Sequence, residues 1–88
     1  MNETNKVLIY TGPSCPFCVA AKSLLKSKNV SFDEINLGDD PSKMDEMLKK
    51  SGGRRTVPQI FIGDTHVGGN DDLQALERDG KLNKLLNI

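Results

Sequence analysis

The sequence has few of the residues that build structural zinc sites, since its 88 residues include two cysteines and one histidine. Such a site needs about four Cys or His ligands, usually in two pairs, so one chain cannot close it and we expect no metal. An excess of positive charge is also missing, because 12 acidic side chains balance 12 basic ones. A nucleic-acid surface depends on such charge. We therefore expect no nucleic-acid partner and favour a small molecule or a protein thiol.

Long apolar runs are missing as well. No run approaches the length of a membrane span, and Met1–Lys6 is polar, without the apolar region of a signal peptide. We therefore expect no membrane association and a cytoplasmic protein whose thiols are kept reduced. The chain has no internal repeat and no low-complexity linker, and its length suits one small core. These absences predict a monomer with one domain over residues 1–88, in which residues 1–5 are flexible.

The chain does contain two closely spaced cysteines, in Cys15-Pro16-Phe17-Cys18, after the apolar run Val7–Tyr10. At the start of a predicted helix, such a pair is a candidate redox centre. Backbone N–H groups and the helix dipole stabilise a thiolate at a helix N-terminus, which makes Cys15 the expected nucleophile. Cys18, one turn further into the helix, is the expected resolving thiol. A purely structural disulfide is less favoured, because so short a loop restrains little chain entropy.

Apolar periodicity and turn residues divide the chain into alternating strands and helices. A strand, a helix and a second strand form a right-handed crossover, so the first two strands are expected to be parallel. The turn Gly63-Asp64 makes the last two strands an antiparallel hairpin. The expected strands are 7–10, 32–37, 59–62 and 65–67, and the expected helices are 16–28, 41–51, one that begins at Asn70 or Asp71, and 81–86.

The second of these helices has signals at both ends. Asp40 can cap it, Pro41 suits its first turn, and Ser51-Gly52-Gly53 ends it. The order of all elements, β-α-β-α-β-β-α, is that of an α/β protein with a thioredoxin-like fold. It predicts a four-stranded mixed sheet flanked by helices.

Three blocks of sequence follow one another between Val7 and Leu86. Their residues and spacing resemble those of dithiol glutaredoxins, and most of all those of the small bacterial type. Thioredoxins differ, because they typically carry Gly-Pro between the cysteines. The blocks are Tyr10-Thr11 with Cys15-Pro16-Phe17-Cys18, Thr56-Val57-Pro58-Gln59-Ile60-Phe61-Ile62, and Gly68-Gly69-Asn70-Asp71-Asp72-Leu73.

The resemblance implies a binding site for glutathione beside the cysteines. It implies a cis peptide bond before Pro58, a Val57 backbone that faces the tripeptide, and a cation, Arg55, that meets its glycine carboxylate. The block 70–72 is implied to hold the γ-glutamyl end, although the same residues can simply cap a helix. The implied glutathione-binding residues are Phe17, Arg55, Thr56, Val57, Pro58, Gly69, Asn70, Asp71 and Asp72.

Several nearby residues have simpler interpretations. Lys49 and Lys50 fit a solvated helix end, where lysines offset the helix dipole. His66 fits a surface position in the fourth strand, with no catalytic role. Phe17 either flanks the bound tripeptide or only packs.

Gly12 is a departure from the family pattern. Many family members carry a lysine three residues before the nucleophilic cysteine, and this chain has a glycine there. The missing cation predicts a less depressed Cys15 pKa. It also predicts weaker glutathione binding unless Arg55 compensates.

The reaction that the resemblance implies is thiol–disulfide exchange, with a role in cell redox homeostasis. We expect the Cys15 thiolate to attack the protein sulfur of a glutathionylated substrate or one sulfur of a protein disulfide. Glutathione or Cys18 then resolves the mixed disulfide, so glutathione is a co-substrate and no cofactor is bound permanently. Two alternatives stay open. One is an electron donor to ribonucleotide reductase that is reduced by thioredoxin reductase, and the other is a carrier of a glutathione-ligated [2Fe-2S] cluster, which Pro16 disfavours.

Overall fold

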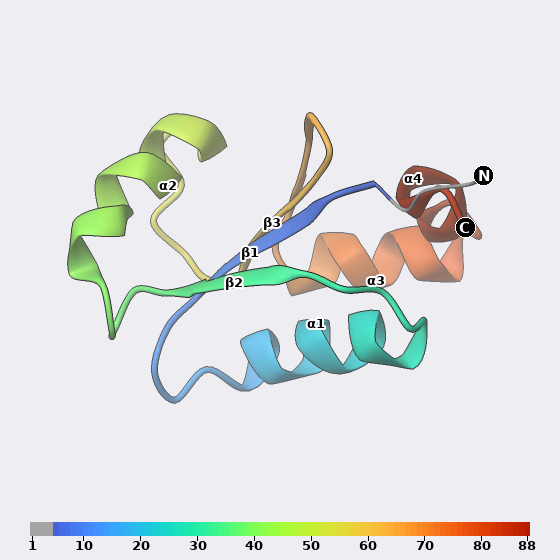
Figure 1. Ribbon diagram of the computed structural model, residues 1–88, viewed down its shortest axis with the longest axis horizontal. Helices are drawn as coiled ribbons and strands as arrows, with labels where there is room; N and C mark the ends of the chain where they lie inside the picture. The colour runs from blue at the N-terminus through green and yellow to red at the C-terminus, as the bar shows by residue number, and fades with distance from the viewer. Residues whose placement is uncertain (1–4) are drawn as a thin grey trace.

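A computed structural model describes residues 5–88 and contains the expected alternation of strands and helices (Figure 1). The expected thioredoxin-like α/β fold is confirmed, with a short 3-10 helix before the second α-helix and a short helix at the end. The elements are β1 Val7–Thr11, α1 Pro16–Ser27, β2 Asp33–Asn36, η1 Pro41–Lys43, α2 Met44–Ser51, β3 Gln59–Ile62, β4 Thr65–Gly68, α3 Asn70–Arg78 and α4 Leu82–Leu86.

The four strands form one mixed sheet in the order β2-β1-β3-β4. β1 and β2 are parallel, whereas β3 is antiparallel to both β1 and β4. Because β1 and β3 run in opposite directions, the end of β1 lies beside the start of β3, and Tyr10 pairs with Gln59 there. The loops that contain Cys15 and Pro58 therefore meet at one end of these two strands.

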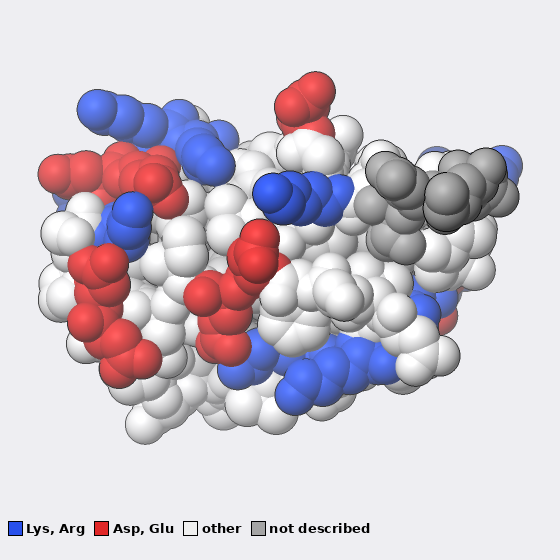
Figure 2. All heavy atoms as spheres, in the orientation of Figure 1, with Lys and Arg blue, Asp and Glu red and all other residues white. Residues whose placement is uncertain are grey.

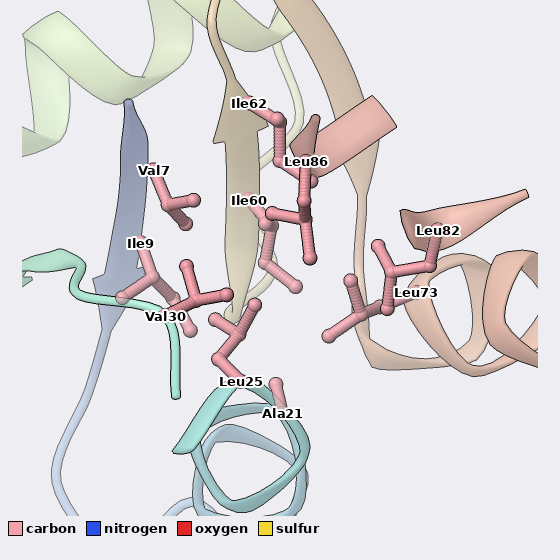
Figure 3. Close-up of a cluster of buried hydrophobic side chains, with 10 residues drawn as sticks. All are labelled: Val7, Ile9, Ala21, Leu25, Val30, Ile60, Ile62, Leu73, Leu82 and Leu86. Carbon is pink, nitrogen blue, oxygen red and sulfur yellow. The ribbon is translucent and has the colours of Figure 1, made fainter. Parts of the chain in front are cut away.

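Helices cover both faces of the sheet, with α1 and α3 on one face and α2 on the other (Figure 1). Successive side chains of a strand point to opposite faces, so Val7 and Ile9 pack toward α1, whereas Leu8 and Tyr10 pack on the α2 side. Burial of one Leu or Ile side chain contributes about 1.5 to 3 kcal/mol, so the larger cluster holds α1, α3 and α4 on the sheet. Its buried members are Val7, Ile9, Ala21, Leu25, Val30, Ile60, Ile62, Leu73, Leu82 and Leu86 (Figure 3).

A smaller cluster lies under α2 and includes a polar contact. Tyr10 is fully buried there with Met47, and its ring meets that of Phe61 edge to face, with centroids 5.8 Å apart. The Tyr10 hydroxyl donates a hydrogen bond to Glu46 of α2. Burial, reinforced by Glu46, raises the pKa of Tyr10, and the same hydrogen bond lowers the pKa of Glu46. The pair therefore joins a protonated hydroxyl to a carboxylate and ties α2 to β1.

The second helical region begins differently from the expectation. It starts with the 3-10 helix η1, and the Asp40 side chain does not bind a helix N–H group. Instead, the Asp40 carboxylate accepts a hydrogen bond of 2.6 Å from the Ser42 hydroxyl, so the expected cap is wrong. Short polar side chains compete for local hydrogen bonds in this way. The expected end is confirmed, because Gly52 follows α2 in the left-handed region at φ 73°.

The expected flexibility of residues 1–5 falls mostly on residues 1–4, which lie outside the described residues. Asn5 is described, and it is tied to α4 at two points. Its backbone N–H donates to the Leu86 carbonyl at 2.9 Å, and its side-chain amide donates to the Leu85 carbonyl at 2.7 Å. These bonds bring the two ends of the described chain together (Figure 1).

Acidic and basic side chains are interspersed on the face of the molecule shown in Figure 2. None of the helices in residues 5–88 combines the length and apolar character that crossing a bilayer requires.

Candidate active site

The two cysteines form a disulfide at the start of α1, with their Cα atoms 5.2 Å apart. Cys15 is the residue that caps the helix, and its sulfur accepts a hydrogen bond of 3.1 Å from the Cys18 backbone N–H. Cys15 is partly exposed, whereas Cys18 is only 2% exposed. An incoming thiol or disulfide can therefore reach Cys15 and not Cys18.

Local sequence explains why the helix starts at this point. Ser14 adopts the left-handed region at φ 52°, which turns the chain, and Pro16 occupies the first turn, where its missing N–H group costs nothing. The first turn of α1 carries no acidic side chain. A thiolate at Cys15 is thus favoured by the Cys18 N–H group and the helix dipole, and no carboxylate on that turn opposes it.

Across from the disulfide lies the start of β3. The Val57-Pro58 peptide bond is cis, which confirms the expectation from the resemblance. The Cys15 Sγ atom lies 3.8 Å from the Val57 carbonyl oxygen. Pro58 is buried and Val57 is partly buried. The Val57 backbone is thereby the part of the protein next to the reactive sulfur.

A groove of about 360 Å³ extends from this point to the start of α3. It brings together side chains from α1, from the loop before β3 and from the first turn of α3. Eight of the nine residues implied to bind glutathione line it, and the ninth, Arg55, does not. The lining residues are Phe17, Arg54, Thr56, Val57, Pro58, Gly69, Asn70, Asp71 and Asp72.

The arginine that lines the groove is Arg54, whereas Arg55, the residue predicted to meet the glycine carboxylate of glutathione, does not line it. Ser51 fixes the backbone of Arg54, because its hydroxyl accepts from the Arg54 N–H and donates to the Arg54 carbonyl, both at 3.1 Å. The guanidinium lies over the groove with Nη1 3.8 Å from Asp72 Oδ2. Two adjacent arginines look equivalent in sequence, so only the fold around Ser51 and Asp72 distinguishes them.

The far wall of the groove is the first turn of α3. Asp72 Oδ2 accepts a hydrogen bond of 3.0 Å from the Gly69 N–H, so the helix-capping interpretation holds for this residue. Gly68 must be a glycine, because its φ is 114° and an added Cβ would collide with the Asp72 carboxylate. Asp71 is exposed beside it. The N–H groups of this first turn have no acceptor within the helix and can bind an anion.

Comparison with known proteins agrees with this geometry. The family profile of glutaredoxin matches residues 7–67. The chain belongs to the glutaredoxin family. A glutaredoxin of Pseudomonas aeruginosa is 55% identical to it over 80 residues, which cover 91% of this chain and 94% of the relative. With the Cys15–Cys18 pair, the chain is a dithiol glutaredoxin of the small bacterial type and a thiol–disulfide oxidoreductase.

Solved structures of glutaredoxins have the same fold. The solution structure of glutaredoxin from Brucella melitensis is 52% identical, with a TM-score of 0.81, and the match covers 97% of this chain and 91% of that one. The crystal structure of a buckwheat glutaredoxin–glutathione complex is 32% identical, with a TM-score of 0.81 and coverage of 93% and 76%.

Gly12 of this glutaredoxin lies close to Val57, the residue whose carbonyl oxygen is also near the Cys15 sulfur. A Cβ atom added at Gly12 would lie 3.3 Å from Cγ2 of Val57, closer than most such contacts. Any larger residue at this position therefore pushes on the Val57 side chain. The lysine of the family pattern, placed at this position, would therefore require a small shift of the Val57 side chain.

Sequence reasoning also missed Gln59 and misjudged the setting of His66. Gln59 is fully buried at the start of β3, and its side chain is hydrogen-bonded to both Thr56 and His66. His66 is partly buried, and this burial, reinforced by Arg54 and opposed by Asp72, lowers its pKa. The sequence signal that could have identified Gln59 is its position as a polar residue in the otherwise apolar strand Gln59–Ile62.

Proposed function

We propose that this glutaredoxin takes electrons from glutathione and uses them to reduce glutathionylated proteins and protein disulfides. The observation that carries the proposal is the groove that runs from Val57, whose carbonyl oxygen lies 3.8 Å from the Cys15 sulfur, to the first turn of α3. Its chemistry suits a peptide with a charged group at each end. The buckwheat glutaredoxin, which has the same fold, was solved in complex with glutathione, and this supports the same assignment.

The groove offers a partner for each part of glutathione. The α3 N-terminus can bind the γ-glutamyl carboxylate, and the exposed Asp71 can pair with the adjacent ammonium. Arg54, in place of Arg55, is the cation for the glycine carboxylate at the other end. The Val57 backbone can pair with the middle of the peptide as an added strand would. This arrangement leaves the glutathione sulfur beside Cys15.

That placement decides which sulfur is attacked. A glutathionyl group in the groove presents its own sulfur to the Cys15 thiolate, so attack falls there and not on the protein sulfur that we had expected. The electron pair of the broken S–S bond leaves with the protein thiolate, which takes up a proton. A second glutathione thiolate then attacks the Cys15 mixed disulfide, regenerates the Cys15 thiolate and departs as glutathione disulfide.

Protein disulfides require the second cysteine. Cys15 attacks one sulfur and forms a mixed disulfide with the substrate, and the Cys18 thiolate then displaces the substrate and forms the Cys15–Cys18 disulfide. Two glutathione molecules restore the dithiol. We propose that the protein acts in this way as a single-domain monomer in the reducing cytosol, with ribonucleotide reductase among its disulfide substrates and no bound cofactor.

A coupled assay tests the proposal. The protein is supplied with a glutathionylated peptide and with NADPH, through either glutathione and glutathione reductase or thioredoxin reductase. We expect NADPH consumption with the glutathione system. Turnover with thioredoxin reductase alone would contradict the proposal, and a brown colour in anaerobically purified protein would favour the cluster carrier.

A further inference from the structure

The buried side chain of Gln59 has a fixed orientation. Its Nε2 atom lies 2.9 Å from the Thr56 carbonyl oxygen and 3.1 Å from Thr56 Oγ1. A carbonyl oxygen can only accept a hydrogen bond, so the amide nitrogen of Gln59 must face Thr56. Gln59 is 0% exposed, and water cannot replace these partners without a change in the loop.

The oxygen of the same amide determines that the Nε2 atom of His66 carries a hydrogen. Gln59 Oε1 lies 2.8 Å from His66 Nε2, and this oxygen can only accept. His66 Nε2 therefore carries a hydrogen, in the neutral ring as in the charged one. The His66 ring is itself stacked on Phe61, with centroids 4.7 Å apart and an angle of 21° between the planes.

These contacts form a chain of interactions from the hairpin to the groove. We propose that Gln59, held in place by His66, is a positioning residue that fixes the Thr56–Val57 backbone for substrate binding next to Cys15. The proposal rests on the proposed glutathione groove, because Thr56 and Val57 line it. Thr56 is an exposed residue, and the buried Gln59 amide supplies the contact that holds its carbonyl.

A positioning role differs from simple burial of a polar group. Thr56 precedes Val57, whose carbonyl lies 3.8 Å from the Cys15 sulfur. Rotation of the Thr56 carbonyl also rotates the peptide plane that carries the Val57 N–H group, which pairs with the substrate backbone in the proposed groove. Loss of Gln59 should therefore weaken substrate binding while the reactivity of the Cys15 thiol stays as it is.

The test compares Gln59→Leu with the wild type in the glutathione-coupled assay. We expect the KM for the glutathionylated peptide to rise about tenfold, the effect of losing one hydrogen-bonded anchor of this kind. The rate of Cys15 alkylation by iodoacetamide should not change, and the Val57 amide signal should shift in the ¹H–¹⁵N NMR spectrum. Ile62→Val, on the same strand and remote from the loop, controls for a general loss of stability and should leave KM unchanged.

His66→Phe tests the contact between His66 and Gln59, because the variant keeps an aromatic ring stacked on Phe61 and removes the N–H group that donates to Gln59. If His66 acts through Gln59, the double variant His66→Phe with Gln59→Leu should have the same KM as Gln59→Leu alone. Effects that multiply would overturn the role given to His66.

Two further outcomes separate this inference from the proposed function. An unchanged KM in Gln59→Leu, together with a raised KM in Arg54→Ala, would overturn the inference and leave the groove in place. If Arg54→Ala and Asp71→Asn also leave KM unchanged, the proposed groove fails and the inference fails with it.

Discussion

Arg54 Nη1 lies 3.8 Å from Asp72 Oδ2, and the same carboxylate oxygen accepts a hydrogen bond from the backbone N–H of Gly69, the residue just before α3. Both side chains are about half exposed, at 48% and 53%. An exposed pair of this kind contributes little to stability. The pair instead orients the Arg54 guanidinium over the groove. Arg55, the next residue in the sequence, does not line that groove.

The first prediction concerns these two arginines. Arg54→Ala should raise the KM for glutathione about tenfold, because it removes the charge-assisted hydrogen bond that we propose to the glycine carboxylate. Arg55→Ala is the matched control, with the same loss of charge one residue away, and should have a much smaller effect. The coupled assay measures both variants at several salt concentrations. A larger effect from Arg55→Ala would contradict the role given to Arg54 and would assign the glycine carboxylate to Arg55.

The second prediction separates the two cysteines. Cys15→Ser should abolish all exchange, because the partly exposed sulfur is lost and Cys18 is only 2% exposed. Cys18→Ser should keep activity on glutathione mixed disulfides, which glutathione itself resolves, and lose most activity on protein disulfides. The measurement compares a glutathionylated peptide with a protein disulfide as substrates. Equal losses of Cys15→Ser and Cys18→Ser on the glutathionylated peptide would rule out the one-cysteine route.

Much of this site could be predicted because its residues are close together in sequence. The position of Cys15 at a helix start follows from Pro16 and the apolar run before it, and the end of α2 follows from Gly52. Local signals of this kind need no knowledge of the tertiary structure. The structure confirms both, and it also contains the cis bond before Pro58 that the family resemblance implied.

The remaining features depend on contacts between distant segments. Arg54 lines the groove and lies beside Asp72, which is far along the chain, whereas Arg55 does not line it. The burial of Gln59 follows from its pairing with Tyr10 and its bond to His66 across the hairpin. Asp40 was predicted as a cap, and the nearby Ser42 hydroxyl binds it instead. Sequence periodicity shows which side chains are buried and does not show which polar partner each one finds.

The third prediction concerns the missing lysine. Gly12→Lys should lower the Cys15 pKa, because a cation near a thiolate favours the charged form. Gly12→Met is the matched control, since it adds a side chain of similar length without charge and makes the same close approach to Val57, 3.3 Å from Cγ2. Alkylation rates measured against pH give the two pKa values. A shift of the same size in both variants would mean that crowding of Val57, and not charge, alters the thiol.

The last prediction concerns three side chains that meet beside the β1–β2 pair, near the end of β1 that leads to Cys15. Glu34 Oε2 accepts hydrogen bonds from the Thr11 hydroxyl at 2.7 Å and from Lys22 Nζ at 3.0 Å. Thr11 is only 1% exposed and directly precedes the loop to Cys15. The bond from Thr11, reinforced by Lys22, lowers the pKa of Glu34 from its ordinary value of 4.5. The network thus joins β1, β2 and α1 beside the active-site loop.

Because the pKa of Glu34 is lower in the folded state than in the unfolded state, ionised Glu34 stabilises the fold above the unfolded value. That contribution is lost as the pH falls through the folded pKa, where both states are protonated. Glu34→Gln should therefore lower the free energy of unfolding at pH 7 by about 1 kcal/mol, the usual range for one hydrogen bond at a partly exposed site. The difference from wild type should shrink toward pH 3. Urea unfolding at both pH values measures it, and Thr11→Val should reduce the same pH dependence because it removes the principal donor. A difference that stays constant between pH 7 and pH 3 would show that Glu34 contributes through packing and not through its charge.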